Sequence, residues 1–231
     1  MPVFLTPDQT GFPPFSQASP EGLLALGGDL SIRRLLTAYA NGIFPWYDDG
    51  TPILWWSPPE RCMLRPGDVH VPRSLRRVIN SRRFQITLDT AFPSVIEQCA
   101  RSGRPGQRGT WLVPEMVSAY AHFHEAGYAH SVEAWMDGEL VGGLYGVCLG
   151  RVFFAESMFY HEAEASKTVL ATFARWFFAR GGLLIDCQQE SSHMLRFGAA
   201  LIPRYEFLER LQQALGGDQP VVLEDFPGPQ A

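Results

Sequence analysis

Apolar and aromatic residues fill positions 152–159 almost without interruption, and the one acid among them is Glu156. This run predicts a buried strand. Between 165 and 180 the apolar residues recur at steps of three and four, which is the period of a helix, with Ser166 as its expected N-cap and two glycines after its end. A second apolar run, 183–188, follows. Strand, helix and strand in this order predict a right-handed crossover between parallel strands.

The second of these strands ends in polar residues. Asp186 and Gln188 stand at its carboxyl end, where open α/β sheets place their sites. We therefore expect Asp186 and Gln188 to be the first candidates for chemistry and Glu156 to be the second. Two alternatives stay open. Asp186 and Gln188 could merely cap the strand, and Glu156 could face solvent or pair with an arginine such as Arg151.

The rest of the chain alternates further helices and strands. Helices are predicted over 31–41, 74–81, 91–100, 114–125 and 193–197, and a strand end and a last helix over 203–215. Strands are predicted over 84–88, 130–135 and 139–147, and the last two should form a hairpin that turns at Asp137–Gly138. Residues 1–20 are expected to be extended. The proline pair Pro58–Pro59 predicts a boundary between a small N-terminal domain, 1–59, and a larger domain, 60–231. The element order of the larger domain is that of an acetyltransferase-like α/β domain, or α+β domain, built on a mixed sheet.

The composition favours a folded protein that stays in the cytoplasm. The chain has 231 residues, of which 46% are hydrophobic, so it can build a proper core. No apolar run approaches the ~20 residues that a membrane span needs, and the start lacks the features of a signal peptide. The four cysteines form no CxxC pair, which is typical of reduced thiols in a cytoplasmic protein.

The charges are unevenly distributed. The net charge of -5 argues mildly against a nucleic-acid partner, yet seven arginines lie between 61 and 83 against the single acid Asp68. Lys167 is the only lysine in the chain. The clustered arginines favour a surface for phosphates, and the alternative is an ordinary solvated face.

Several motifs then occur in an order that resembles one family, the leucyl/phenylalanyl-tRNA–protein transferases. They are GLLALGGDLS, GIFPWY, ILWWSP, GTW, HEAGYAHSVE, LVGGLYGV, ESMF, ASKT and LIDCQ, spread from about Phe12 to Leu211. The resemblance implies a GCN5-type N-acetyltransferase-like fold with a small N-terminal domain. It also implies transfer of leucine or phenylalanine from aminoacyl-tRNA to proteins that begin with arginine or lysine, which marks the product for degradation by the N-degron pathway.

This reaction is the aminolysis of an activated ester, so no metal and no cofactor is expected. Positioning of the two substrates can supply roughly 7–11 kcal/mol of the barrier reduction. Asp186 would remove the proton or hold the ammonium group, and Gln188 would orient the amine or relay its proton. Glu156 would hold the adenosine or the cationic end of the acceptor. We expect a cytoplasmic monomer.

The resemblance also implies binding residues. The acyl side chain would lie among apolar residues that could equally be core, and methionine is a plausible minor donor. These residues are Leu144, Phe153, Met158, Leu170, Phe173, Ala174, Phe177 and Ile185. Trp46 and Trp111 would stack on the terminal adenosine, unless they only pack. Acceptor-stem phosphates would contact arginines in the basic segment, namely Arg73, Arg76, Arg77, Arg82 and Arg83.

Three other functions would use some of the same residues. A coenzyme A-dependent acetyltransferase would need a glycine-rich loop before the helix, but the turn at 161–168 has acids and no glycine. A non-catalytic RNA-binding protein could use the same arginines and tryptophans. A thiol hydrolase would need Cys187 and His193 together, but Cys187 is expected on the strand face opposite Asp186 and Gln188.

Overall fold

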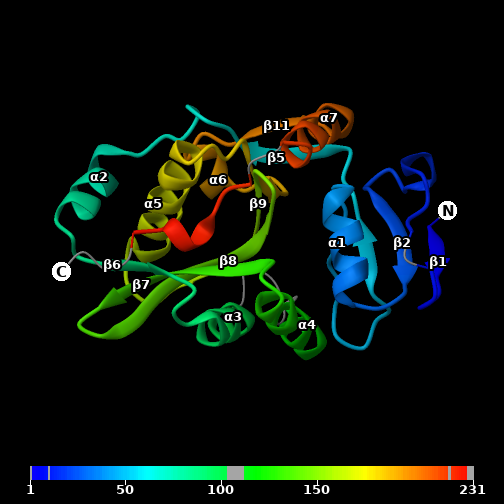
Figure 1. Ribbon diagram of the computed structural model, residues 1–231, viewed down its shortest axis with the longest axis horizontal. Helices are drawn as coiled ribbons and strands as arrows, with labels where there is room; N and C mark the ends of the chain where they lie inside the picture. Colours follow the sequence, from blue (N-terminus) through cyan, green and yellow to red (C-terminus); the bar gives the residue numbers. More distant parts are fainter. Residues whose placement is uncertain (1, 10, 103–111, 218–219, 228–231) are drawn as a thin grey trace.

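A computed structural model describes residues 2–9, 11–102, 112–217 and 220–227. Within these ranges the strands form two sheets that lie side by side along the long axis of the molecule (Figure 1). The smaller sheet has four strands in the order β1-β2-β4-β3, and the larger has seven in the order β11-β5-β10-β9-β8-β7-β6. The larger sheet carries the predicted crossover, and the smaller one flanks it.

The smaller sheet is built from the first part of the chain. Its strands are β1 (Val3–Leu5), β2 (Leu23–Gly27), β3 (Phe44–Pro45) and β4 (Leu54–Trp56). Helix α1 (Ile32–Ala40) begins at Ser31, whose side chain accepts a hydrogen bond from the amide of Arg34, as an N-cap should. All strands of this sheet come from residues before the predicted boundary at 59, but whether the two sheets are separate domains stays a prediction.

The larger sheet is mixed, as predicted. Its strands are β5 (Glu60–Leu64), β6 (Gln85–Leu88), β7 (Ala129–Met136), β8 (Glu139–Leu149), β9 (Val152–Tyr160), β10 (Leu184–Gln188) and β11 (Ala200–Pro203). Strands β9 and β10 are parallel, and the other neighbouring pairs are antiparallel. The predicted hairpin of β7 and β8 is confirmed, with its turn at Asp137–Gly138.

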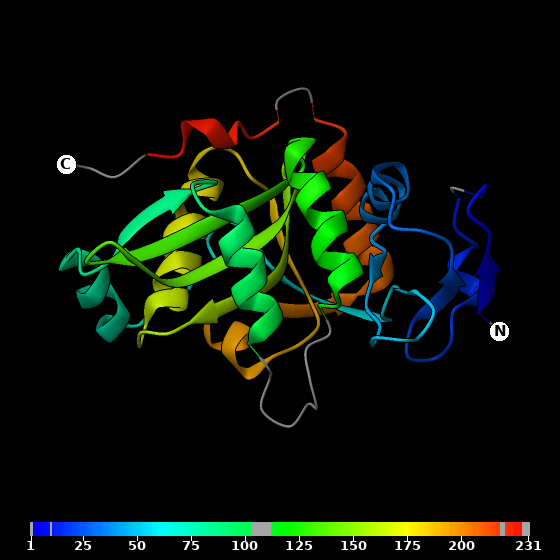
Figure 2. The same cartoon turned by 90° about the horizontal axis from the view of Figure 1, so that it is seen from below.

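Helices cover both faces of this sheet (Figures 1 and 2). Helices α3 (Phe92–Arg101) and α4 (Pro114–Glu125) lie on one face, and α5 (Ala165–Ala179) lies on the other with α2 (Arg73–Asn80) beside it. Helices α6 (Ser192–Arg196) and α7 (Arg204–Leu215) follow β10 and β11. Two short 3-10 helices, at Phe15–Gln17 and Leu223–Asp225, complete the fold. None of the helices in the described ranges is long and apolar enough to cross a lipid bilayer.

The crossover β9–α5–β10 has the predicted parallel register, with Ile185 opposite Phe153 and Asp186 opposite Phe154. One detail of the prediction was wrong. The N-cap of α5 is Glu164, which has a left-handed φ of 72°, and Ser166 lies inside the first turn. The helix ends as expected, because Gly181 takes a positive φ directly after it.

The two parallel strands separate beyond this register. Strand β9 continues to Tyr160 with only β8 beside it, whereas β10 ends at Gln188 after an irregularity in its pairing with β5. The separation leaves the ends of β9 and β10 facing a space that is not filled by strand pairing. The candidate site lies there.

Candidate active site

A cleft of about 780 Å³ opens where β9 and β10 separate. Its walls come from β3 and the residue after it, from β8 and β9, from the start of α5, and from the segment between β10 and α6. The volume is within the range of sites that bind small molecules or parts of larger substrates. Glu156 and Gln188 both line it, so the structure brings together two of the three residues that the sequence singled out.

Glu156 is buried, and its carboxyl accepts hydrogen bonds from neutral groups on three different elements. The Tyr39 hydroxyl of α1 donates to Oε1 at 2.8 Å, and Gln188 Nε2 donates to the same oxygen at 2.7 Å. The Tyr120 hydroxyl of α4 donates to Oε2 at 3.4 Å, and the two tyrosine hydroxyls contact each other. Glu156 therefore neither faces solvent nor pairs with Arg151, whose Nε instead donates to the carbonyl of Gly181.

This environment changes the acidity of Glu156. Burial raises the pKa of the Glu156 carboxyl to about 8, against the lowering effect of the Tyr39 hydrogen bond. The charge of Asp186 adds to the rise, and Arg61 and Tyr120 oppose it. An α-amine has a pKa of about 7.7–8.0, so Glu156 and such an amine could exchange a proton with little cost.

Asp186 is bound quite differently. Its side chain is fully buried and forms an ion pair with Arg61 of β5. The guanidinium group donates from Nε to Oδ1 at 2.8 Å and from Nη2 to Oδ2 at 2.6 Å. The guanidinium group also donates to the carbonyl of Gly42 and lies over the rings of Phe44 and Phe207. Asp186 does not line the cleft, in contrast to the expectation that it faces the substrate.

Asp186 nevertheless reaches the site through the backbone. Its Oδ1 accepts a hydrogen bond from the Gln188 amide at 2.8 Å. Gln188 has a φ of 60°, a left-handed conformation that a non-glycine residue adopts only at a cost. The Asp186 carboxylate therefore helps to hold Gln188 in the conformation that presents its side chain to the cleft.

Cys187 lines the cleft wall beside Gln188, at a bulge between Asp186 and Gln188 in the pairing of β10 with β5. It packs against the core cluster that contains Cys62, whereas Arg61, the partner of Asp186, lies over rings of the other core cluster, so Cys187 and Asp186 lie toward different sides of the sheet. His193 also lines the cleft. However, the neighbouring Cys62 thiol and burial hold the pKa of Cys187 well above its usual range, which disfavours a thiolate nucleophile.

The predicted acyl-binding residues divide into two groups. Leu144 and Met158 line the cleft. The others do not line it and are buried in the core between the sheet and α5; these are Phe153, Leu170, Phe173, Ala174, Phe177 and Ile185. They form the layer behind the cleft wall.

Only one of the two predicted adenosine-binding tryptophans can be placed. Trp46 is partly buried and lines the cleft, and its carbonyl accepts a hydrogen bond from Trp56 Nε1 at 2.7 Å. Trp55, by contrast, is fully buried in the core. Trp111 lies outside the described residues.

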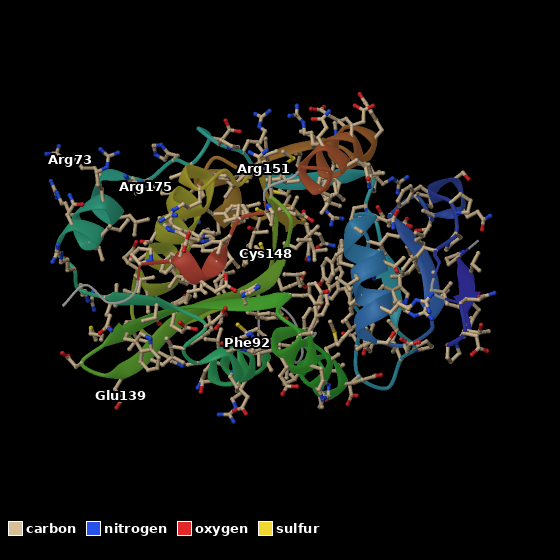
Figure 3. All side chains as sticks on the ribbon, viewed as in Figure 1. Arg73, Phe92, Glu139, Cys148, Arg151 and Arg175 are labelled. Carbon is tan, nitrogen blue, oxygen red and sulfur yellow. The ribbon has the colours of Figure 1, made fainter. Side chains whose placement is uncertain are left out.

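The five predicted tRNA-binding arginines are all exposed, on α2 and directly after it. Figure 3 shows Arg73 at the outer edge of the molecule. Arg83 forms an ion pair with Glu162 at 2.6 Å, and Arg76 donates to the carbonyl of Val71. None of the five lines the cleft, and they lie on a surface next to α5 that adjoins the cleft at the turn carrying Glu162.

Sequence reasoning missed Arg61, Tyr39 and Tyr120. Arg61 was grouped with the basic segment, although it is buried and is separated from its partner by 125 residues. The hydroxyls of Tyr39 and Tyr120 reach Glu156 from helices that are distant in the sequence. A carboxylate in an apolar run does predict some buried partner, but the sequence does not identify it.

Comparison with known proteins gives a consistent result over nearly the whole chain. A family model described as leucyl/phenylalanyl-tRNA protein transferase matches residues 63–212, and a model of that family's N-terminal domain matches residues 28–59. A leucyl/phenylalanyl-tRNA–protein transferase of Oleidesulfovibrio alaskensis is 57% identical over 220 residues, covering 93% of this chain and 89% of the relative. One from Nitratidesulfovibrio vulgaris is 55% identical over 215 residues, with coverages of 93% and 92%.

Solved structures align less closely. A GCN5-related N-acetyltransferase from Kribbella flavida aligns with a TM-score of 0.38 and 14% identity, covering 73% of this chain and 59% of that one. The α+β class with a mixed sheet rests on the strand order of the protein itself.

Proposed function

Because this chain belongs to the leucyl/phenylalanyl-tRNA–protein transferase family, we propose that it transfers leucine or phenylalanine, and to a minor extent methionine, from aminoacyl-tRNA to the N-terminal α-amine of proteins that begin with arginine or lysine. The amine nitrogen attacks the ester carbonyl, an amide bond forms, and the ester bond to the tRNA breaks. The proton lost by the amine ends on the released ribose hydroxyl. The product would be marked for degradation by the N-degron pathway.

The observation that carries this proposal is the contact between Gln188 and Glu156 on the wall of the cleft. Glu156 uses the amide nitrogen of Gln188, so the amide oxygen is the atom left to accept a hydrogen bond from an incoming amine. Glu156 lies one hydrogen bond further on, with a pKa near that of the amine. Gln188 thus orients the nucleophile, and Glu156 can take up the proton through it. This amounts to general base catalysis, which contributes typically about 10²–10⁴-fold.

Asp186 has a supporting role in this scheme. Both of its oxygens are engaged, by Arg61 and by the backbone of Gln188. We therefore assign Asp186 to the positioning of Gln188, in place of direct proton removal.

The substrates fit the remaining walls of the cleft. Trp46, together with Trp111, would hold the terminal adenosine by stacking, and the acyl side chain would pack against Leu144 and Met158. The buried phenylalanines behind them would fix the depth of that recess. Glu190 also lines the cleft and has no hydrogen-bond or ion-pair partner among the described residues, which favours a cationic acceptor. The arginines of α2 would contact phosphates of the acceptor stem.

The state of the cysteines bears on the compartment in which the protein works. The four cysteines are free thiols, which supports a cytoplasmic protein, and we expect it to act as a monomer. No cofactor enters the scheme, because the ester is already activated.

The test is direct. The protein is incubated with leucyl-tRNA and a peptide that begins with arginine, and the peptide is examined for the mass gain of one leucine. A peptide of the same sequence that begins with alanine should gain nothing, and Gln188→Ala should lose most of the activity while it still binds tRNA. A gain that is equal for both peptides would contradict the proposed acceptor specificity, and no gain at all would contradict the proposed transfer.

A further inference from the structure

The end of the cleft next to α5 carries basic side chains that the acyl transfer does not use. Lys167, in the first turn of α5, lines this end together with His193 and Arg196 of α6. Lys167 is the only lysine in the chain, and its side chain is 40% exposed. Its Nζ donates to Glu164 at 2.6 Å. An ammonium group has three donors, so two remain for a ligand.

Two cations and one acid act on His193 at this end of the cleft. The pKa of His193 is lowered first by burial, then by the charges of Lys167 and Arg196, and Glu164 raises it by less than either cation lowers it. The two cations therefore outweigh the acid at the position of the imidazole. A neutral imidazole beside two cations can donate a hydrogen bond to an anion without adding to their mutual repulsion.

An exposed aromatic ring lies near the start of α5, because Tyr160 pairs with Gly142, which lies against Ala165 in the first turn of that helix. Tyr160 is the last residue of β9, lines the cleft and is 66% exposed, whereas its neighbour Phe159 is 1% exposed. An aromatic face next to cationic side chains is the arrangement that proteins use for single-stranded nucleic acid, because the ring stacks on a base and the cations take up the phosphate.

This end of the cleft is also continuous with the arginines of α2. Arg83 pairs with Glu162, which lies in the turn between β9 and α5, and Lys167 follows that turn. Helix α2 packs against α5 (Figures 1 and 2). A strand of phosphates that leaves α2 would therefore reach Lys167 and Arg196 before the interior of the cleft.

We propose that the α5 end of the cleft binds the nucleotide that precedes the terminal adenosine of the donor tRNA. Lys167 and Arg196 contact its phosphate, and Tyr160 stacks on its base. This assignment rests on the proposed function, in which Trp46 holds the terminal adenosine and Gln188 the amine. It adds a subsite that does not contact the reacting ester and that binds only the end of the RNA.

The experiment compares three donors that share one phenylalanyl ester: phenylalanyl-tRNA, phenylalanyl-cytidylyl-adenosine, and phenylalanyl-adenosine, which has neither the phosphate nor the second base. Lys167→Met keeps the aliphatic stem and removes the charge, and Tyr160→Ala removes the ring. The matched control is Arg180→Met, which removes a half-exposed, ion-paired cation at the opposite end of α5.

Lys167→Met is expected to raise KM about tenfold or more for the two donors that carry the phosphate, as for a lost hydrogen bond between charged groups. It should also reduce the slope of log KM against log salt by about 0.7 for phenylalanyl-tRNA. Tyr160→Ala is expected to raise KM for the same two donors by about five- to hundredfold. With phenylalanyl-adenosine, both variants should stay within about twofold of the wild type, as should Arg180→Met with every donor.

Two results would overturn the inference while leaving the proposed function intact. One is an equal loss with phenylalanyl-adenosine, which would place these side chains at the acyl group or the acceptor. The other is wild-type behaviour of both variants with phenylalanyl-tRNA. A wild-type protein that transfers phenylalanine from no donor would instead refute the proposed function, and the inference with it.

Discussion

Two carboxylates on neighbouring parallel strands, Asp186 and Glu156, are bound in opposite ways. Asp186 faces a guanidinium group that fills both of its oxygens, and it has no access to the cleft. Glu156 faces two hydroxyls and an amide, all of them neutral, and it lines the cleft. Both side chains are almost completely shielded from solvent.

The difference shows that the charge of its partners decides whether a buried carboxylate in this sheet suits a structural role or proton transfer. A buried ion pair holds two elements in register, because separating its members leaves an uncompensated charge. Neutral donors stabilise the ionised form less, so burial prevails and the pKa of Glu156 rises to about 8. The first arrangement fixes Gln188, and the second leaves a group that can change its protonation state near neutral pH.

The largest effect should come from breaking the ion pair. Arg61→Met leaves the Asp186 charge buried without its cationic partner and should lower the free energy of unfolding by about 3–5 kcal/mol, measured by urea denaturation. The double variant Arg61→Met/Asp186→Leu should recover a large part of that loss and still fail in transfer, since Gln188 then loses the acceptor of its backbone amide. Unchanged stability of Arg61→Met would mean that the pair does not hold the strands.

Glu156 should behave in the reverse manner, with a loss of rate and an intact fold. Glu156→Gln keeps the size of the side chain and should lower the rate of transfer by about 10²-fold or more. The ratio of wild-type to variant rates, taken at each pH so that ionisation of the acceptor amine cancels, should rise from pH 7 to pH 9 as Glu156 loses its proton. A ratio that stays constant across this range would exclude Glu156 as the proton acceptor.

The same carboxyl should make stability depend on pH. The pKa of folded Glu156 is about 8, above the ordinary value of 4.5, so the folded state binds the proton more tightly than the unfolded chain. The wild type should therefore lose stability relative to Glu156→Gln as pH rises from 4.5 toward 8, with no further change above that. Each kcal/mol should appear as about 2–4 °C in Tm, measured for both proteins at pH 6 and pH 8.5.

The hydroxyls around Glu156 should have the smallest effects. Tyr39→Phe removes the donor that most lowers the pKa of Glu156, and should move the pH midpoint of transfer upward by about 1–2 units. Tyr120→Phe, whose bond is longer, should move it less. The matched control is Tyr145→Phe, because the buried Tyr145 hydroxyl has no hydrogen-bond partner among the residues that the structure describes and its removal should leave the midpoint in place. A shift in Tyr145→Phe as large as that in Tyr39→Phe would show that general packing sets the midpoint.

What could be predicted from the sequence was local. The β9–α5–β10 crossover follows from apolar periodicity within forty residues, and Glu156 stood out as the one acid in an apolar strand. Gln188 was found because polar residues end an apolar run. Strands β2, β3, β4 and β5 were not predicted, because segments of two to five residues show little periodicity.

What could not be predicted depended on contacts between distant parts of the chain. The bulge between Asp186 and Gln188 arises in the pairing of β10 with β5, and the left-handed φ of Gln188 accompanies it, so neither could be read from β10 alone. The N-cap of α5 is a left-handed Glu164, which no propensity rule would choose over Ser166. Arg61, the partner of Asp186, was counted with the basic segment, because the sequence does not distinguish a buried arginine from an exposed one.

The position of α1 has a consequence for how this protein can be divided. Tyr39 and Trp46 lie ahead of residue 59, yet one tunes the acidity of Glu156 and the other walls the cleft. A fragment that starts at the large sheet would retain Gln188 and Glu156 but carry a carboxyl with a different proton affinity and a cleft that is open on one side. The residues ahead of the large sheet are thus needed both for the acidity of Glu156 and for one wall of the cleft.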